Sequence, residues 1–221
     1  MGKETDLFAG YPPAQRVVSP TIRTIKNRIT ASYRDEEFYD GARDNGYGGM
    51  KDDGRWKPIA HHIREHYRLT DGDRVLQLRA HKGYLCRELR DLGLKVTGCE
   101  TSDYAIEKAS YPLDKASPMR LPYDDGEFDL VIAANVVYTE NLEGAIKILR
   151  EIQRVSRKHA WATFAAYESE AEPDGLLLMR YWVLLGTTIL TKADWLEVMA
   201  HAGYSGDWRF DTAQFMNLVR G

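Results

Sequence analysis

The sequence predicts an α/β protein built on a mostly parallel sheet of seven strands, with helices on both faces. From residue 71 onward, short apolar runs alternate with helical patterns, an order that favours parallel strands joined by covering helices. The last two apolar runs are separated by too few residues for a helix. We therefore expect the sheet to end in an antiparallel last strand.

The expected strands are short and rich in apolar and β-branched residues. They cover Arg74–Leu78, Lys95–Glu100, Phe128–Asn135, His159–Tyr167, Asp207–Phe210 and Phe215–Arg220. One more strand is expected near Ala109–Met119, where Pro112 and Pro118 keep it short or irregular.

The expected helices carry their apolar residues on one face. They cover Lys57–Tyr67, Gly83–Leu92, Ser102–Ser110, Gly144–Ser156 and Thr191–Ala202. Thr191 with Asp194 three residues later has the spacing of a capping box, with Asp in place of Glu. Residues 181–190 form either a packing helix that ends at Gly186 or a segment that shapes a ligand pocket.

The composition is that of a globular protein. Of the 221 residues, 43% are hydrophobic and 29% are charged, which suffices for one substantial core. The formal net charge of −3 gives no general attraction to nucleic acid. The two cysteines, Cys86 and Cys99, fall in core-like segments, so reduced thiols are expected. Because the N-terminus lacks a signal-peptide pattern and no apolar run could span a bilayer, we expect a cytoplasmic protein without membrane contact.

The N-terminal quarter has a different character from the rest. Residues 1–35 are polar and mixed, and residues 36–56 contain five glycines interleaved with aromatic and charged residues. We interpret residues 1–56 as an arm or lid over the active site of a domain spanning residues 57–221. In this interpretation Tyr47 and Trp56 pack on a ligand and Arg55 supplies a cation. The alternative is a glycine-rich surface loop that its aromatic residues anchor to the core.

A ligand site is expected where the strands end, because open α/β sheets bind ligands at the carboxyl ends of their strands. The loop 79–83 follows the first strand of the alternating region, and Glu100 ends the second. Glu100 follows Gly83 by 17 residues, a spacing that fits one helix plus one strand. Its carboxylate is placed to accept hydrogen bonds from the hydroxyls of a ribose.

Three stretches resemble the class I S-adenosylmethionine (SAM) methyltransferases over residues 57–221. DRVLQLRAHKGYLCRELRDLGLKVTGCE looks like their first two motifs, MRLPYDDGEFDLVIAAN like their middle motifs, and TKADWLEVMAHAGYSGDWRF like their last helix and closing strands. GYGG-x4-GRW in the lid resembles a small bacterial subgroup associated with surface-polysaccharide or small-molecule biosynthesis. The resemblance implies a Rossmann-like fold and SAM as cofactor.

The cofactor loop departs from the family pattern. Family members usually have Asp at the position of Gln77 and glycines at the positions of Arg79 and His81. Three explanations stay open. The loop is remodelled, with Arg79 or Lys82 engaging the carboxylate of SAM; SAM serves chemistry other than methyl transfer; or the chain has lost SAM.

The resemblance also implies a set of site residues. The predicted cofactor-binding residues are Tyr47, Arg55, Trp56, Gln77, Arg79, His81, Lys82, Gly83, Glu100, Thr101, Ser117, Pro118, Met119 and Asn135. The predicted catalytic residues are Tyr138, Glu140 and Tyr167, with Glu140 as the acceptor of a proton and the tyrosines as orienting groups. For Glu140 the alternative is a solvated residue before a helix, for Tyr167 packing at the rim, and for His81 a structural hydrogen bond.

These observations predict an O- or N-methyltransferase that acts on a small polar molecule, such as a sugar or a natural-product intermediate. The alternatives are a SAM-using cyclase or lyase that releases methylthioadenosine, and a non-catalytic partner subunit. His62 and His66 lie one helical turn apart, but no third ligand is evident, so no metal site is expected. A small-molecule substrate is the expected partner, and a homodimer is compatible with the sequence.

Overall fold

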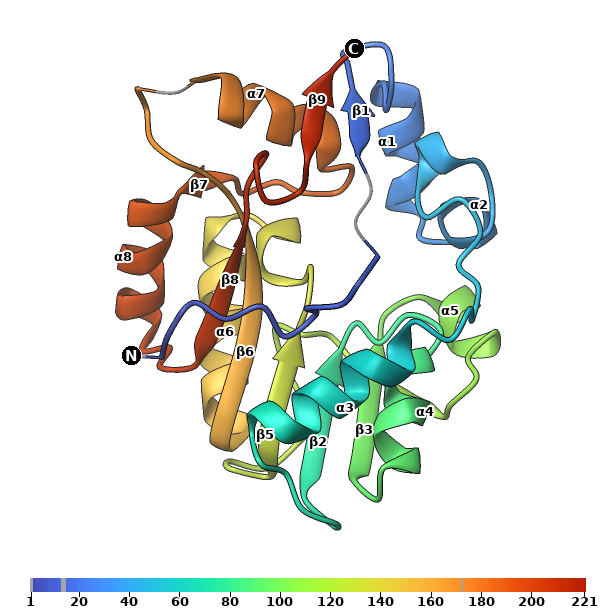
Figure 1. Cartoon of the computed structure of the whole chain (residues 1–221), viewed down its shortest axis with the longest axis vertical. Coiled ribbons are helices and arrows are strands. Elements are labelled where there is room, and N and C mark those ends of the chain that lie inside the picture. Colours follow the sequence, from blue (N-terminus) through green and yellow to red (C-terminus); the bar gives the residue numbers. More distant parts are fainter. Residues whose placement is uncertain (1, 13–14, 172) are drawn as a thin grey trace.

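The computed structural model describes residues 2–12, 15–171 and 173–221. Its larger sheet has seven strands in the order β4-β3-β2-β5-β6-β7, with β8 also paired to β6, and every pairing is parallel. The strands of this sheet are β2 (Arg74–Leu78), β3 (Lys95–Glu100), β4 (Leu113–Lys115), β5 (Phe128–Ala133), β6 (Ser156–Tyr167), β7 (Leu190–Thr191) and β8 (Asp207–Asp211). The mostly parallel seven-stranded sheet is thus confirmed (Figure 1).

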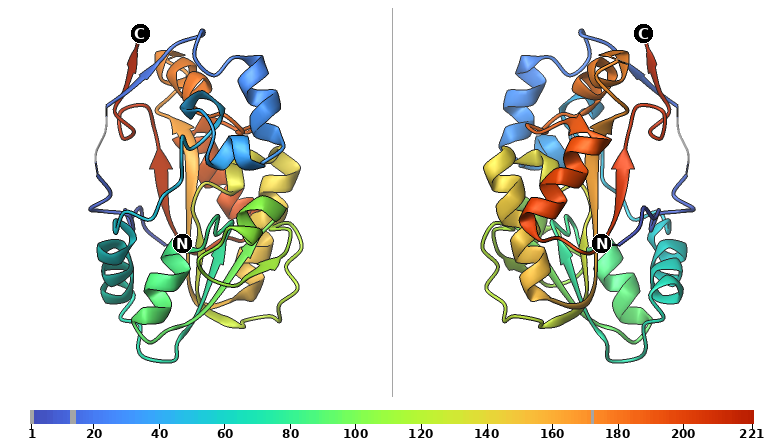
Figure 2. Two further views of the ribbon diagram at one scale, coloured as in Figure 1. Left: turned by 90° about the vertical axis from the view of Figure 1, so that its right-hand side faces the viewer. Right: turned by 90° about the vertical axis from the view of Figure 1, so that its left-hand side faces the viewer.

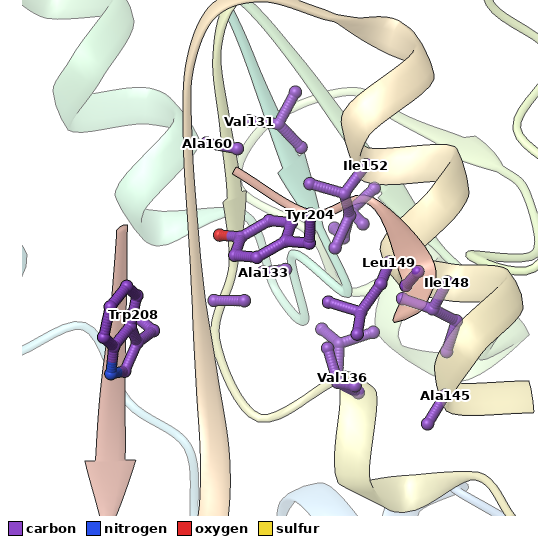
Figure 3. Packing of buried hydrophobic residues seen from close by; sticks show 14 of the residues in the cluster. Val131, Ala133, Val136, Ala145, Ile148, Leu149, Ile152, Ala160, Tyr204 and Trp208 are labelled. Atoms are coloured by element: carbon purple, nitrogen blue, oxygen red, sulfur yellow. The ribbon is translucent and has the colours of Figure 1, made fainter. Parts of the chain in front are cut away.

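Helices cover both faces of the sheet, as predicted. One face carries α3 (Trp56–His66) and α4 (Tyr84–Asp91), which share an apolar cluster with alternate residues of β2 and β5. The other face carries α6 (Leu142–Val155) and α8 (Lys192–Ala202), which pack on the opposite residues of the same strands. Figure 3 shows part of this second core, where Leu149 and Ile152 lie beside Val131 and Ala133.

The predicted antiparallel last strand is wrong. β8 runs parallel to β6, with Trp161 opposite Asp207 and Ala165 opposite Asp211. After β8, hydrogen bonds from Met216 to Thr212 and from Leu218 to Ala213 turn the chain out of the sheet. The final strand, β9 (Leu218–Arg220), instead pairs in parallel with β1 (Arg16–Val18) as a separate two-stranded sheet. The sequence pattern missed this because the partner strand lies at the far end of the chain.

The N-terminal segment is built into the core before it reaches the site. Glu4 forms a parallel bridge with Trp208, the indole of Trp161 donates to the carbonyl of Thr5 at 2.8 Å, and Leu7 is fully buried. The chain then forms β1, α1 (Ile25–Ser32), α2 (Glu36–Tyr39) and the 3-10 turn η1 (Arg43–Asn45). Figure 2 shows α1 and α2 above the edge where the strands of the large sheet end.

Three further elements complete the structure. They are α5 (Asp103–Glu107), the 3-10 turn η2 (Val137–Thr139) and α7 (Pro173–Trp182). α5 is shorter than its predicted range, and α7 ends before the predicted stop at Gly186. Among the described residues, no helix is long and apolar enough to span a membrane.

Candidate functional site

The candidate site lies at the carboxyl ends of the central strands. The cofactor loop, residues 79–83, follows β2; Glu100 ends β3; and residues 134–141 follow β5. Residues 25–50, which include α1, α2 and η1 and are called the covering segment below, lie over this edge (Figure 1).

The cofactor loop keeps a glycine-like backbone without the glycines. Arg79 and His81 have φ values of +48° and +54°, and Gly83 has +71°. Side chains other than glycine in this left-handed region cost about 1 kcal/mol each. At Gly83 an added Cβ would also lie 3.0 Å from the Cβ of Tyr111. The departure from the family pattern is therefore confined to the side chains that Arg79 and His81 add.

Glu100 is held by the backbone of the two loops that meet at the strand ends. Its Oε2 accepts from the backbone N–H of His81 at 3.0 Å, and its Oε1 accepts from those of Thr101 at 2.7 Å and Ser102 at 3.3 Å. The residue is only 1% exposed. Thr101, predicted to contact the cofactor, here holds Glu100 in place.

Arg79 occupies the end of the cleft where the resemblance places the methionine part of SAM. Its guanidinium donates to Glu140 at 2.7 Å and also to the hydroxyl of Thr139, while its Nε has no partner among the described residues. Burial and then the nearby Arg34 lower its pKa. Gln77 has its amide oxygen engaged by the Cys86 thiol at 3.1 Å. Arg79, paired with Glu140, thus stands at this end of the site, and the neutral Gln77 stands where the family usually has an acid.

His81 and two tyrosines of the covering segment fill the space beside Glu100. The Tyr47 hydroxyl lies 3.0 Å from Nε2 of His81, and its ring is stacked on Tyr39 with centroids 5.9 Å apart. Burial lowers the pKa of His81 to about 4, so its imidazole is neutral at pH 7. Tyr39 is fully buried, and burial followed by the charge of Glu100 raises its pKa.

An ion pair between the buried Lys82 and the exposed Asp40 fastens the covering segment to the cofactor loop. The amino group of Lys82 lies 2.6 Å from both carboxylate oxygens of Asp40 and 3.2 Å from the carbonyl of Met50. Tyr104 donates to the same carboxylate at 2.7 Å. Lys82, which was predicted to bind the cofactor, therefore binds the covering segment in this structure.

The structure does not bring Arg55 and Trp56 to this cleft. Trp56 packs against Phe8 and Tyr11, with ring centroids 5.9 and 6.0 Å apart, beside the core under α3. Arg55 is paired with Asp53 and donates to the Tyr11 hydroxyl at 2.6 Å. Of the predicted lid residues, only Tyr47 lies against the cofactor loop.

Asn135 and Tyr138 form a fixed pair after β5. Asn135 has a φ of +57°, its N–H donates to the Thr163 hydroxyl at 2.8 Å, and its side-chain oxygen accepts from Tyr138 at 3.1 Å. Burial raises the pKa of Tyr138. The hydrogen bond of Tyr167 to Glu170 raises the pKa of that phenol to about 12. Both tyrosines are therefore protonated at neutral pH and suited to orient a group, not to remove a proton.

The carboxylate side chain of Glu140, the third predicted catalytic residue, is partly exposed to solvent. Its side chain is 28% exposed and lines an open cavity of about 460 Å³. Met119 lines the same cavity, next to Ser117 and Pro118 in the loop that a bridge between Ser117 and Arg120 closes. Met119, one of the predicted cofactor-binding residues, and the predicted catalytic carboxylate of Glu140 thus line the same cavity.

The residues around Glu100 fit a bound nucleoside. Near Glu100 three buried polar atoms have no hydrogen-bond partner among the described residues: the hydroxyl of Tyr39, Nε of Arg79 and Nδ1 of His81, the last 3.7 Å from Oε2 of Glu100. Unpaired buried polar atoms are costly, so a ligand that satisfies them binds favourably. Ribose hydroxyls both donate and accept, which matches a carboxylate flanked by a phenol and an imidazole.

Comparison with known proteins agrees with this geometry. A family model described as a methyltransferase domain matches residues 77–164, from β2 to β6. The fold is the class I methyltransferase fold. YcgJ from Bacillus subtilis superimposes with a TM-score of 0.54 at 16% identity; the match covers 65% of this chain and 66% of YcgJ, just under two thirds of that protein. No curated protein matches this sequence.

Two further solved structures share this methyltransferase fold. A SAM-dependent methyltransferase from Archaeoglobus fulgidus has a TM-score of 0.51 at 12% identity, over 71% of this chain and 70% of that one. The [4+2]-cyclase SpnF has a TM-score of 0.52 at 20% identity, over 88% of this chain and 74% of that one. Since one of these proteins is named as a cyclase, the fold leaves the reaction open.

Several residues of the cleft carried no recognisable sequence signal. Tyr39, Asp40 and Arg34 lie in a segment that resembles a polar loop, and Tyr104 lies in a short helix. Each contacts the cofactor loop or its neighbour only through the tertiary fold. The one available hint was the aromatic pair at 38–39, which is unusual in an otherwise acidic stretch.

Proposed function

We propose that the protein is a SAM-dependent transferase that methylates an oxygen or nitrogen of a small polar molecule, such as a sugar or a natural-product intermediate. The observation that carries this proposal is the convergence of unpaired polar atoms around Glu100, at the position where the methyltransferase fold binds its cofactor. SAM, when bound, supplies an electrophilic methyl group on a sulfonium.

The chain's own residues divide the binding task. The carboxylate of Glu100 accepts hydrogen bonds from the ribose hydroxyls. The side chains of Tyr39 and His81 form the remaining hydrogen bonds of those hydroxyls. The segment 117–119 borders the adenine side. Arg79, with its free Nε, attracts the carboxylate of the cofactor. Because Glu100 is buried and Tyr39, which belongs to the covering segment, is buried beside it, that segment must move for a ligand to enter.

Glu140 is the proposed acceptor of the proton that a hydroxyl or ammonium nucleophile loses. It lines the open cavity, and its pairing with Arg79 orients one carboxylate oxygen. Tyr138 and Tyr167 stay protonated and orient the acceptor. Positioning of the nucleophile supplies most of the rate enhancement in such a transfer.

The filled cleft favours a second candidate, a non-catalytic partner subunit on the same scaffold. Arg79 and His81 occupy space that the family leaves free, and the covering segment is fastened by the pair Lys82–Asp40. A protein whose covering segment never moves away would bind no cofactor. It would function only by binding another protein with its surface.

Incubation with SAM and a panel of small sugars and amines, followed by mass spectrometry, tests the proposal. We expect S-adenosylhomocysteine together with an acceptor that gains one methyl group. Release of methylthioadenosine from SAM alone would instead indicate cyclase or lyase chemistry. If neither product forms, and dialysis detects no binding of S-adenosylhomocysteine, the partner-subunit candidate replaces the enzyme.

A further inference from the structure

The outer face of α1 carries a row of exposed apolar side chains, called the α1 row below. Ile25, Ile29 and Tyr33 have exposed fractions of 72%, 53% and 71%. Tyr33, the C-cap, keeps a helical backbone conformation, so a spacing of four residues places all three side chains on one side of the helix. Single exposed apolar residues are ordinary, whereas a contiguous row is typical of an interaction surface. Figure 1 shows α1 at the periphery of the molecule.

The opposite side of α1 is fixed to the rest of the molecule. Ala31 is fully buried. The guanidinium of Arg28 donates to the carbonyls of Arg180, Val183 and Leu184, in and just after α7, at 2.6–2.9 Å. Because these contacts fix the rotation of the helix, the α1 row stays directed away from the core.

The two ends of α1 carry opposite charges. Lys26 is exposed in its first turn, and the exposed acids Asp35 and Glu36 follow its last turn. The first turn contains no acidic residue and the last turn no basic one, so the helix dipole is not compensated within the helix. In the described part of the chain, neither Lys26 nor Glu36 forms an ion pair.

A second copy of this chain, with its α1 antiparallel to the first, matches both features. A twofold axis near Ile29 brings Ile25 of each copy to the partner's Tyr33, and Ile29 to the partner's Ile29. The same axis brings Lys26 toward the acidic end of the other helix and opposes the two helix dipoles. An anionic lipid surface fits less well, because Asp35 and Glu36 at the end of the row would be repelled by it.

We propose that the α1 row is the contact surface of a homodimer in which two α1 helices pack antiparallel. This inference does not depend on the proposed transferase function. Since α1 begins the covering segment, the contact joins the covering segments of the two copies. A pair of short helices buries less than a standard interface, so we expect a weak dimer with a dissociation constant of about 10–100 µM.

Sedimentation velocity of the parent protein at about 1–500 µM tests the dimer across its expected dissociation constant. We expect a reversible shift from monomer to dimer as the concentration rises. Ile29→Glu places two like charges at the twofold axis and should weaken association about tenfold or more. The matched control is Leu142→Glu, which changes a side chain on α6 that is 47% exposed and should leave association unchanged.

A charge exchange tests the antiparallel arrangement. Lys26→Glu and Glu36→Lys should each weaken association about threefold or more, because the twofold axis makes each substitution break two contacts. The double variant restores opposite charges between residue 26 of one copy and residue 36 of the other. It should therefore associate more tightly than either single variant.

A monomer at every concentration would overturn the proposal. Association that Ile29→Glu leaves unchanged, or a double variant no tighter than the single ones, would do the same. Cosedimentation of a monomeric protein with anionic phospholipid vesicles would assign the α1 row to a membrane surface instead. Binding of S-adenosylhomocysteine, measured separately by calorimetry, tests the transferase function and leaves the result for the dimer unaffected.

Discussion

The two halves of the candidate site differ in how far they follow the methyltransferase pattern. At the half proposed to hold the ribose, called the ribose half below, Glu100 stands where that pattern has an acid, and three backbone N–H donors hold it in place. At the half proposed to hold the methionine part of SAM, Arg79 and Gln77 stand where that pattern has glycine and acid, and the backbone at Arg79 and His81 has left-handed φ values. The loop therefore combines a backbone conformation that favours glycine with the bulky side chains of Arg79 and His81.

The covering segment connects the two halves. It contacts the ribose half through Tyr39 and Tyr47, and it is fastened to the cofactor loop by Asp40 and Lys82. Substitutions in either half of the site should therefore change both the free energy of unfolding and the affinity for a ligand.

The largest effect is expected at Glu100. Glu100→Ala leaves the N–H groups of His81, Thr101 and Ser102 buried and unpaired, which should lower the free energy of unfolding by about 3–5 kcal/mol. Urea unfolding measures this loss. Glu100→Gln keeps one acceptor oxygen and should lose distinctly less; equal losses would show that the backbone contacts do not stabilise the loop.

Asp40→Asn should weaken the attachment of the covering segment to the cofactor loop. It removes the charge opposite the buried amino group of Lys82, which we expect to cost about 2–3 kcal/mol. Amide hydrogen exchange in residues 34–50 should become faster, as mass spectrometry would detect. The matched control is Asp53→Asn, which breaks the more exposed pair with Arg55 and should change stability by less than about 1 kcal/mol. Unchanged exchange in Asp40→Asn would mean that the aromatic contacts alone hold the cover.

Acid should destabilise the ribose half through His81. Its folded pKa of about 4 lies below the ordinary 6.5, so the unfolded chain binds more protons between these values. The contribution of His81 is full above pH 6.5 and decreases as the pH falls toward 4, by about 2 kcal/mol between pH 7 and pH 5. The free energy of unfolding, determined at pH 7 and at pH 5 for the parent protein and for His81→Gln, measures this contribution. A variant with the same pH dependence as the parent protein would contradict this assignment.

Local patterns predicted the central strands and most helices closely. β2 and β3 match their predicted ranges, and Thr191 caps α8 through Asp194 as expected. The strand at 113–115 is short, in agreement with the prolines on either side. These features depend on periodicity, proline and capping, all of which are local properties of a sequence.

The features that sequence patterns missed are non-local. The parallel pairing of β9 with β1 joins residues about two hundred positions apart, and Asp40 meets Lys82 across 42 positions. Bulky residues at 79 and 81 suggested a remodelled loop, because left-handed φ values are rare outside glycine. The surrounding hydrogen bonds impose that backbone despite its intrinsic cost.

We propose that the loop of residues 79–83 binds SAM even though Arg79 and His81 stand where the family usually has glycines. Calorimetric titration with S-adenosylhomocysteine tests it most directly, on the parent protein and on the variant with Gln77→Asp, Arg79→Gly and His81→Gly. We predict saturable one-to-one binding to both, about tenfold tighter for the variant because the cleft regains space and an acid for the amino group. Binding by the variant with none by the parent protein, up to millimolar ligand, would contradict the claim and show that Arg79 and His81 have closed the site.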